Sequence, residues 1–142
     1  MSAIVVDASV VAAAFFQEQY AAEAEAALQQ ANLHAPDLLI TEFCNVVWKR
    51  ARRNELTPDD PAWLMARFGA LSLKYDSTNH LAEMALDMAI RTGRTVYDSM
   101  YVALAVELGA AVLTADLRLV NGLRDTPLAA YVQWIGDWKK AV

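Results

Sequence analysis

The sequence predicts an α/β fold, a three-layer α/β/α sandwich around a short central sheet that is mainly parallel. Short apolar runs recur along the chain without the polar alternation of half-exposed strands, which is typical of strands covered on both faces. Segments with helical patterns separate these runs, and such an alternation favours right-handed crossovers between parallel strands. At 142 residues, with few glycines and prolines, the chain is expected to form a single domain over residues 1–142.

The N-terminal half is assigned from composition and from helix start signals. The β-branched run "AIVV" predicts the first strand, and alanine-rich segments predict the helices that follow it. Pro36 stops a brief second strand, and Asp37 is expected to be the N-cap of the next helix. The expected elements are strands at 3–6 and 32–36 and helices at 10–16, 20–31, 38–53 and 57–71.

The C-terminal half is divided by glycines and capping residues. Gly93 and Gly109 are expected to end two helices, because glycine adopts the left-handed conformation of a helix C-terminus at little cost. Thr95 is expected to open the second of these helices. The expected elements are strands at 71–75, 110–116 and 129–135 and helices at 77–93, 95–109 and 117–125.

Composition limits the class of protein and its location. The single cysteine, Cys44, excludes an internal disulfide framework, and its apolar neighbours predict a buried thiol in a reducing compartment. The apolar N-terminus lacks the basic start of a signal peptide, and Asp7 interrupts it well before membrane-spanning length. We therefore expect a cytoplasmic protein with no membrane partner. A formal net charge of -5 argues at first against a nucleic-acid partner.

Four carboxylates stand in apolar surroundings, where an unpaired ionised group is strongly disfavoured. Asp7 ends the run "IVVD" and Asp116 ends "VLTAD", so both are expected at the carboxyl edge of the sheet, where α/β proteins bind ligands. Glu42 lies in "LLITEFCNVVW", and Asp98 begins the largely apolar run "DSMYVALAVEL".

Each acid also has a purely structural interpretation. Thr95 and Asp98 have the spacing of a capping box, and Asp7 and Asp116 each precede a predicted helix that they could cap. Glu42 lies too far inside its helix to be a cap, but it could be a buried glutamate paired with an arginine. Taken singly, the four residues leave both interpretations open.

Taken together, the acids indicate a metal site. Carboxylates gathered at one edge repel each other unless a cation joins them, and oxygen ligands without a histidine or cysteine cluster favour Mg²⁺ or Mn²⁺ over zinc. Such an ion suits phosphodiester chemistry. His34 and His80 lack ligand spacing and are expected to be structural or surface residues. The sequence has no P-loop, dinucleotide fingerprint or serine nucleophile elbow.

Four segments resemble the PIN-domain ribonucleases, and among them the VapC toxins of type II toxin–antitoxin systems. The resemblance covers essentially the whole chain, and the order and intervals of its motifs fit. The matching segments are "IVVDASV", "TEFCNVVWK", "TVYDSMYVALA" and "VLTADLRL".

The resemblance implies a metal-dependent endoribonuclease whose catalytic acids are Asp7, Glu42, Asp98 and Asp116. It makes Asp7 and Asp98 the expected direct ligands of Mg²⁺ or Mn²⁺. In this family small hydroxyl residues often support the site, and the resemblance assigns this role to Ser9 and Thr114, with Asn121 as a weaker candidate. None of the three is ranked as catalytic. It also implies an RNA substrate, a homodimer and a cognate antitoxin that inhibits the enzyme, with larger toxin–antitoxin assemblies.

The negative charge does not exclude RNA, because the four proposed ligands contribute most of it and a metal would offset them. The segment "KRARR" holds four of the twelve basic residues. Glu42, Asn45, Lys49 and Arg53 share one stripe of a helix, which would place Lys49 about 10 Å and Arg53 about 16 Å beyond Glu42. We hypothesise that Lys49 and Arg53 bind the RNA backbone; the alternative is that they complement the helix C-terminus.

Other readings of the same residues remain. Large apolar side chains on two predicted helices could form a dimer surface or could belong to the core: Trp48, Trp63, Met65 and Phe68. The rival functions are a receiver-like signalling module with an acidic Mg²⁺ pocket, a catalytically silent protein-binding PIN scaffold, and a haloacid-dehalogenase-like phosphatase. A receiver domain would need paired acids after its first strand and a lysine after its last, and this chain has neither. A haloacid-dehalogenase-like phosphatase would need Asp-x-Asp where this chain has Asp7-Ala-Ser9.

Overall fold

Five parallel strands form the sheet of the protein, whose computed structural model describes residues 2–139. The strand order is β3-β2-β1-β4-β5, and each neighbouring pair is parallel. The predicted parallel sheet is therefore confirmed. The strands are β1 (Ile4–Val6), β2 (Leu33–Pro36), β3 (Leu73–Asp76), β4 (Val112–Thr114) and β5 (Val132–Trp134).

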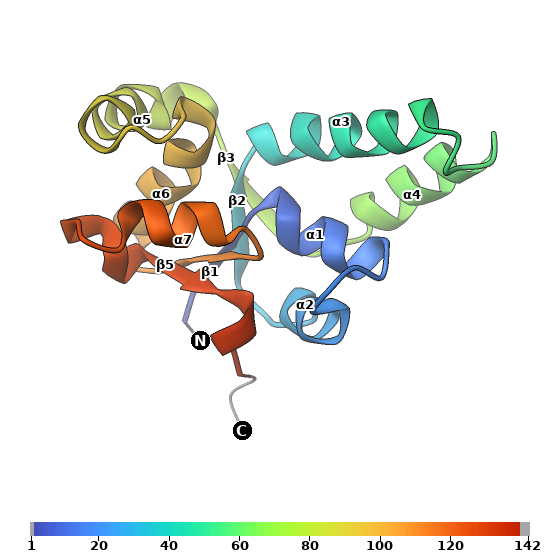
Figure 1. Cartoon of the computed structure of the whole chain (residues 1–142), viewed down its shortest axis with the longest axis horizontal. Coiled ribbons are helices and arrows are strands. Elements are labelled where there is room, and N and C mark those ends of the chain that lie inside the picture. Colours follow the sequence, from blue (N-terminus) through green and yellow to red (C-terminus); the bar gives the residue numbers. More distant parts are fainter. Residues whose placement is uncertain (1, 140–142) are drawn as a thin grey trace.

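Helices cover both faces of this sheet. Figure 1 shows α1 to α4 on one side and α5 to α7 on the other, which confirms the three-layer sandwich. The helices are α1 (Ala8–Phe15), α2 (Ala21–Leu28), α3 (Leu38–Arg52), α4 (Asp60–Gly69), α5 (Thr78–Thr92), α6 (Val96–Leu108) and α7 (Leu117–Leu123). Short 3-10 helices at Pro127–Tyr131 and Ile135–Asp137 flank β5.

The centre of the sheet fixes where the strand ends lie. Val5 of β1 pairs with His34 of β2 on one side and with Val112 of β4 on the other, and Val5 and Val112 are fully buried. The backbone N–H of Asp7 donates to the carbonyl of Leu113 at 3.4 Å. Residues that directly follow β1 and β4 therefore meet at one edge of the sheet.

Helix α6 packs against three of the strands, β1, β2 and β4. Its middle residues, from Tyr101 to Ala105, are buried without interruption, as expected for a helix that is apolar on nearly all sides. Thr95 caps its N-terminus through the N–H of Asp98, and Gly109 ends it with φ of 62°, as predicted. This burial makes α6 a rigid support for the side chains at its N-terminal end.

An aromatic cluster holds α1, α3 and α4 together. The Phe43 ring stacks on Phe68 at 4.5 Å between centroids and meets the edge of Phe15 at 5.3 Å. Phe68 therefore belongs to the core, whereas Trp48 and Trp63 are 53% and 60% exposed. Of the two alternatives that the sequence left open, the core holds for Phe68 and the surface holds for Trp48 and Trp63.

Three sequence expectations need correction. Asp37 precedes α3 as predicted, but it has helical backbone angles and its Oδ1 accepts from the N–H of Thr78, so it contributes to the start of α5 instead. Cys44 is exposed, because it lies on the solvent side of α3 next to buried Phe43. The last strand is shorter than expected, since residues 127–131 form a 3-10 turn.

Within residues 2–139 the structure contains no helix with the length and apolar character that crossing a membrane requires.

Candidate active site

Asp7 is a buried carboxylate at the junction of β1 and α1, with 9% of its surface exposed. Its Oδ1 accepts hydrogen bonds from the backbone N–H groups of Ser9 at 3.0 Å and Val10 at 3.3 Å, and from the Ser9 hydroxyl. Asp7 therefore does cap α1. Burial nevertheless dominates and raises its pKa to about 6, against the opposing effect of these donors.

A chain of hydroxyl groups connects the ends of β1 and β4. The Ser9 Oγ lies 3.3 Å from Thr114 Oγ1 and accepts from the N–H of Ala115 at 2.8 Å. Thr114 Oγ1 in turn accepts from the N–H of Asp116 at 3.0 Å. Ser9 and Thr114 thus fix the two strand ends, and with them Asp7 and Asp116, relative to each other.

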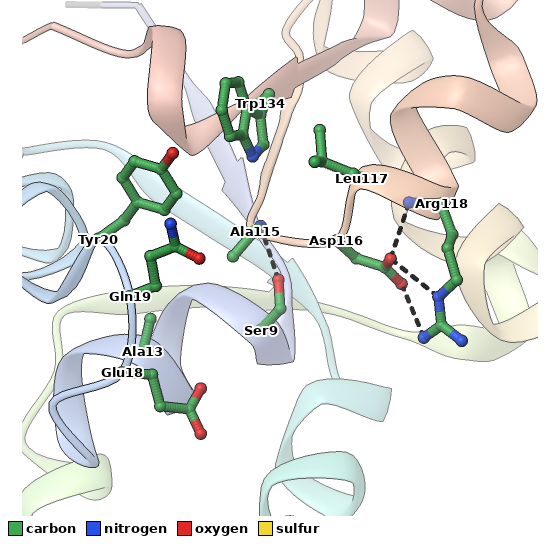
Figure 2. Close-up of a pocket in the computed structure, with 10 residues that line it drawn as sticks. All are labelled: Ser9, Ala13, Glu18, Gln19, Tyr20, Ala115, Asp116, Leu117, Arg118 and Trp134. Atoms are coloured by element: carbon green, nitrogen blue, oxygen red, sulfur yellow. Dashed lines mark hydrogen bonds and ion pairs between the residues drawn. The ribbon is translucent and has the colours of Figure 1, made fainter.

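Asp116 caps α7 and is also paired with an arginine. Its Oδ1 accepts from the N–H of Arg118 at 2.9 Å and from Nε of the same residue at 3.2 Å. Figure 2 shows the carboxylate turned toward the Arg118 guanidinium. The hydrogen bond with Asp116 raises the pKa of Arg118, and the more distant charge of Asp98 adds to this effect.

Glu42 is half-buried on α3 and accepts a hydrogen bond from the hydroxyl of Tyr101 on α6. Burial raises the pKa of Glu42, while the Tyr101 hydrogen bond lowers it and the charge of Asp98 raises it. Burial also raises the pKa of Tyr101 strongly, followed by the charge of Glu42. The phenol therefore stays protonated and acts as a hydrogen-bond donor.

Asp98 pairs with Arg94 rather than completing a capping box. Arg94 Nη2 lies 3.4 Å from Asp98 Oδ2, while the cap itself is the Thr95 hydroxyl. The Arg94 stem lies against Gly122 of α7, where an added Cβ would come within 2.7 Å of Arg94 Cδ. Gly122 therefore leaves the space that the arginine needs to reach Asp98.

Three of the four predicted acids act on one another electrostatically. The charge of Glu42 raises the pKa of Asp7, and that of Asp98 raises the pKa of Glu42. The charges of all three raise the pKa of Tyr101, whose hydroxyl donates to Glu42. Asp116 is connected to the group through the hydroxyl chain from Asp7 and through Arg118.

The residues fit a hard divalent cation in their chemistry. The donors are oxygens, and within the described chain neither Asp7 nor Glu42 forms an ion pair that would balance its charge. As they stand, however, no three acidic, histidine or cysteine side chains of residues 2–139 lie close enough to enclose an ion. Asp98 and Asp116 instead face Arg94 and Arg118.

Comparison with known proteins agrees with this fold. The model of the PIN domain matches residues 4–122. The chain belongs to the PIN-domain family.

Named relatives of this PIN domain are similar over most of their length. It is 39% identical to ribonuclease VapC3 of Pyrobaculum aerophilum over 121 residues, covering 83% of this chain and 92% of the relative. It is 34% identical to ribonuclease VapC9 of Mycobacterium tuberculosis over 116 residues, with 82% and 87% covered. A crystal structure of a protein from Pyrobaculum aerophilum has the same fold, with a TM-score of 0.65 at 22% identity, covering 95% and 92% of the two chains.

The remaining candidates of the sequence lie outside the acidic group. Lys49 and Arg53 are exposed at the end of α3 and line a surface hollow with Trp48 and Arg52. The side chain of Asn121 is bonded to Arg124. His34 Nε2 contacts Asn32 and His80 contacts Glu107, in keeping with structural roles.

Sequence reasoning assigned no role in the candidate site of this PIN domain to three residues that contact its acids: Tyr101, Arg94 and Arg118. Helix periodicity offered a signal for Tyr101, which is three positions from Asp98 on the same helix. Arg94 precedes that helix, four positions before Asp98. No comparable spacing pointed from Tyr101 to Glu42, since those residues are 59 positions apart and meet only in the folded chain.

Replacing Asp7 with Asn should stabilise the metal-free PIN domain at neutral pH. Because the pKa of about 6 in the folded state lies above the ordinary aspartate value of 3.8, the folded state binds the proton more tightly, and stability falls as the pH rises through this interval. Asn keeps the cap without the buried charge, so Asp7→Asn should gain up to about 3 kcal/mol at pH 7.5 and little below pH 4. Urea unfolding at both pH values measures this gain in the free energy of unfolding, and Asp87→Asn is the control for losing one carboxylate. If pH changes the stability of both variants equally, the prediction for Asp7 is wrong.

Replacing Tyr101 with Phe should leave Glu42 Oε1 without its donor. The loss of a hydrogen bond to a half-buried carboxylate should cost about 1 kcal/mol in the free energy of unfolding and raise the pKa of Glu42 further. Urea unfolding and NMR titration of Glu42 measure the two effects. The matched control is Tyr97→Phe on the same helix, whose ring is exposed. If the two variants behave alike, the Glu42–Tyr101 contact has no energetic role.

Proposed function

We propose that this PIN domain is a metal-dependent endoribonuclease that cleaves RNA phosphodiester bonds and acts as the toxin of a toxin–antitoxin pair. The observation that carries the proposal is that the Tyr101 hydroxyl donates to Glu42, while the charges of Glu42, Asp7 and Asp98 all raise the pKa of Tyr101. The names of the similar proteins, ribonucleases VapC3 and VapC9, support the same activity.

The proposed ligands of the ion are Asp7 and Asp98, with Glu42 and Asp116 completing the catalytic acids. A bound Mg²⁺ or Mn²⁺ would supply positive charge for the scissile phosphate and lower the pKa of a water. Asp7 suits this role because its buried charge has no cationic partner among the described residues. Glu42, whose pKa is raised by burial, is suited to accept and release a proton.

The arginines of the site would keep the ion-free acids from repelling one another. Arg94 is held against Gly122 and pairs with Asp98, while Arg118 pairs with Asp116. For Asp98 to bind an ion, its carboxylate would have to turn from Arg94, whose guanidinium would then be available to a phosphate oxygen. The Arg94 guanidinium would thus pair with Asp98 before substrate enters and with a phosphate afterwards.

The proposed path of the RNA backbone runs from the acids along α3. Lys49 and Arg53 are exposed and lie on the stripe of the helix that starts at Glu42. Exposed cations along this stripe would attract phosphates despite the acidic composition of the chain.

The proposed protein partners are a cognate antitoxin and a second copy of this chain. An antitoxin that covers the acids with a basic side chain would pair with the carboxylates that now bind Arg94 and Arg118, namely Asp98 and Asp116. The exposed indoles of Trp48 and Trp63, on α3 and α4, provide apolar area for a homodimer. Larger toxin–antitoxin assemblies would combine both contacts.

Replacing Asp98 with Asn should abolish metal-dependent RNA cleavage. Loss of one group that stabilises the reacting phosphate typically lowers the rate by about 100-fold or more. The assay uses purified protein with single-stranded and structured RNA in Mg²⁺, in Mn²⁺ and in chelator.

The matched control for Asp98→Asn is Asp87→Asn. Asp87 pairs with Arg91 four residues away on α5, as Asp98 pairs with Arg94, but this pair is exposed to solvent. The control should cleave like the original chain. Absence of cleavage by the original chain on every RNA would instead favour a silent PIN scaffold that binds proteins, and cleavage unaffected by Asp98→Asn would exclude the proposed site.

Replacing Lys49 and Arg53 with Ala should weaken RNA binding and reduce its dependence on salt. Each lost phosphate contact should lower the slope of log affinity against log salt by about one. Fluorescence anisotropy with a labelled single-stranded RNA, in the Asp98→Asn background, measures the slope. Lys74→Ala with Arg91→Ala removes the same charge elsewhere; an equal loss in this control would mean that only net charge matters.

A further inference from the structure

A pocket of about 540 Å³ opens beside the acidic edge of the sheet. Figure 2 shows its lining, which comes from α1, from the loop that leads to α2, from the β4–α7 junction and from β5. Ser9 and Asp116 belong both to this lining and to the candidate active site. Its size is in the range of small-ligand pockets.

Two aromatic rings form the wall of the pocket farther from Asp116. Tyr20 and Trp134 meet edge to face, with ring centroids 5.2 Å apart and an interplanar angle of 79°. The Trp134 ring lies so close to Gly136 that an added Cβ there would approach it to 2.5 Å. Tyr20 has φ of 66°, a left-handed conformation that is unfavourable for a residue with a side chain. The fold thus holds both rings at this wall against a local backbone cost.

Polar groups without protein partners surround the same space. Figure 2 shows the indole nitrogen of Trp134 and the side-chain amide of Gln19 directed toward the space between Tyr20 and Ala115. Among the described residues neither group, nor the Tyr20 hydroxyl, forms a hydrogen bond with another side chain or with the backbone. An aromatic wall with free donors and an acceptor is the chemistry that recognises an unstacked nucleobase.

The charge at the rim of the pocket does not oppose a nucleotide. Glu18 lines the pocket, but it forms an ion pair with Arg50, which is itself held over the Phe16 ring at 4.0 Å. Arg118 stands at the opposite side of the lining next to Asp116, with most of its side chain exposed. A phosphate near Asp116 would thus have a cation beside it while its base enters the pocket.

We propose that this pocket binds one nucleobase of single-stranded RNA, in the nucleotide next to the phosphate that is cleaved at the acidic edge. Tyr20 and Trp134 provide the stacking surface, and Gln19 provides a donor and an acceptor for the edge of the base. The proposal rests on the proposed ribonuclease function for its placement, and it makes the pocket the source of a base preference at one position of the cleavage site.

The deciding test is an NMR titration of the ¹⁵N-labelled full chain with the four nucleoside 5′-monophosphates, without metal. The indole signal of Trp134, assigned with Trp134→Phe, and the amide of Gln19 should shift, while the exposed indole of Trp63 stays unmoved. Tyr20→Asn should weaken binding about fivefold or more, because it removes the ring and Asn tolerates the left-handed backbone. Unmoved Trp134 and Gln19 signals, as in a pocket that takes a protein segment, would overturn the proposal.

Cleavage mapping on a randomised single-stranded RNA then tests the placement beside the scissile phosphate. Gln19→Ala should change the base preference at one position by about fivefold or more, whereas Gln133→Ala, on an exposed position adjacent to Trp134, should keep it. Unchanged preference in Gln19→Ala would overturn the placement. If the original chain cleaves no RNA, the ribonuclease proposal fails, while the nucleotide titration still decides whether the pocket binds a base.

Discussion

The burial of the Asp7 carboxylate is the constraint on which the site depends. Its position at the end of the central strand brings it out of water, and three donors from the first turn of α1 compensate this only in part, since its pKa remains raised to about 6. The same Ser9 hydroxyl that donates to Asp7 also accepts from the β4–α7 junction. One buried charge therefore organises both strand ends and leaves unbalanced negative potential at the edge of the sheet.

The protein deals with its four acids in two different ways. Asp98 pairs with Arg94 and Asp116 pairs with Arg118. Asp7 and Glu42, by contrast, have only hydroxyl and backbone donors among the described residues. Arginine pairs offset the charge, and hydroxyl donors fix an oxygen in place without offsetting it. In the proposed metal site, a cation would gain most from Asp7 and Glu42, and Asp98 would first have to open its contact with Arg94.

The structural and functional interpretations of these acids turned out not to exclude each other. Asp7 and Asp116 are N-caps, as local sequence predicted, and both also lie at the sheet edge. Asp98 is different, because Thr95 alone makes the side-chain cap and the carboxylate is free to pair with Arg94. Capping therefore positions the carboxylates, and it does not compete with a role in the site.

The sequence by itself determined the order of strands and helices, the ends of the helices at Gly93 and Gly109, and the family, because these depend on local backbone preferences and short motifs. It also pointed to Asp7 and Asp116 through the ends of strands, and to Glu42 and Asp98 through their apolar surroundings. Only the tertiary structure decided that Tyr101 meets Glu42, that Gly122 makes room for Arg94, and that Tyr20 meets Trp134. These contacts join residues far apart in the chain, and no local pattern encodes a distance that arises only when helices pack on a sheet.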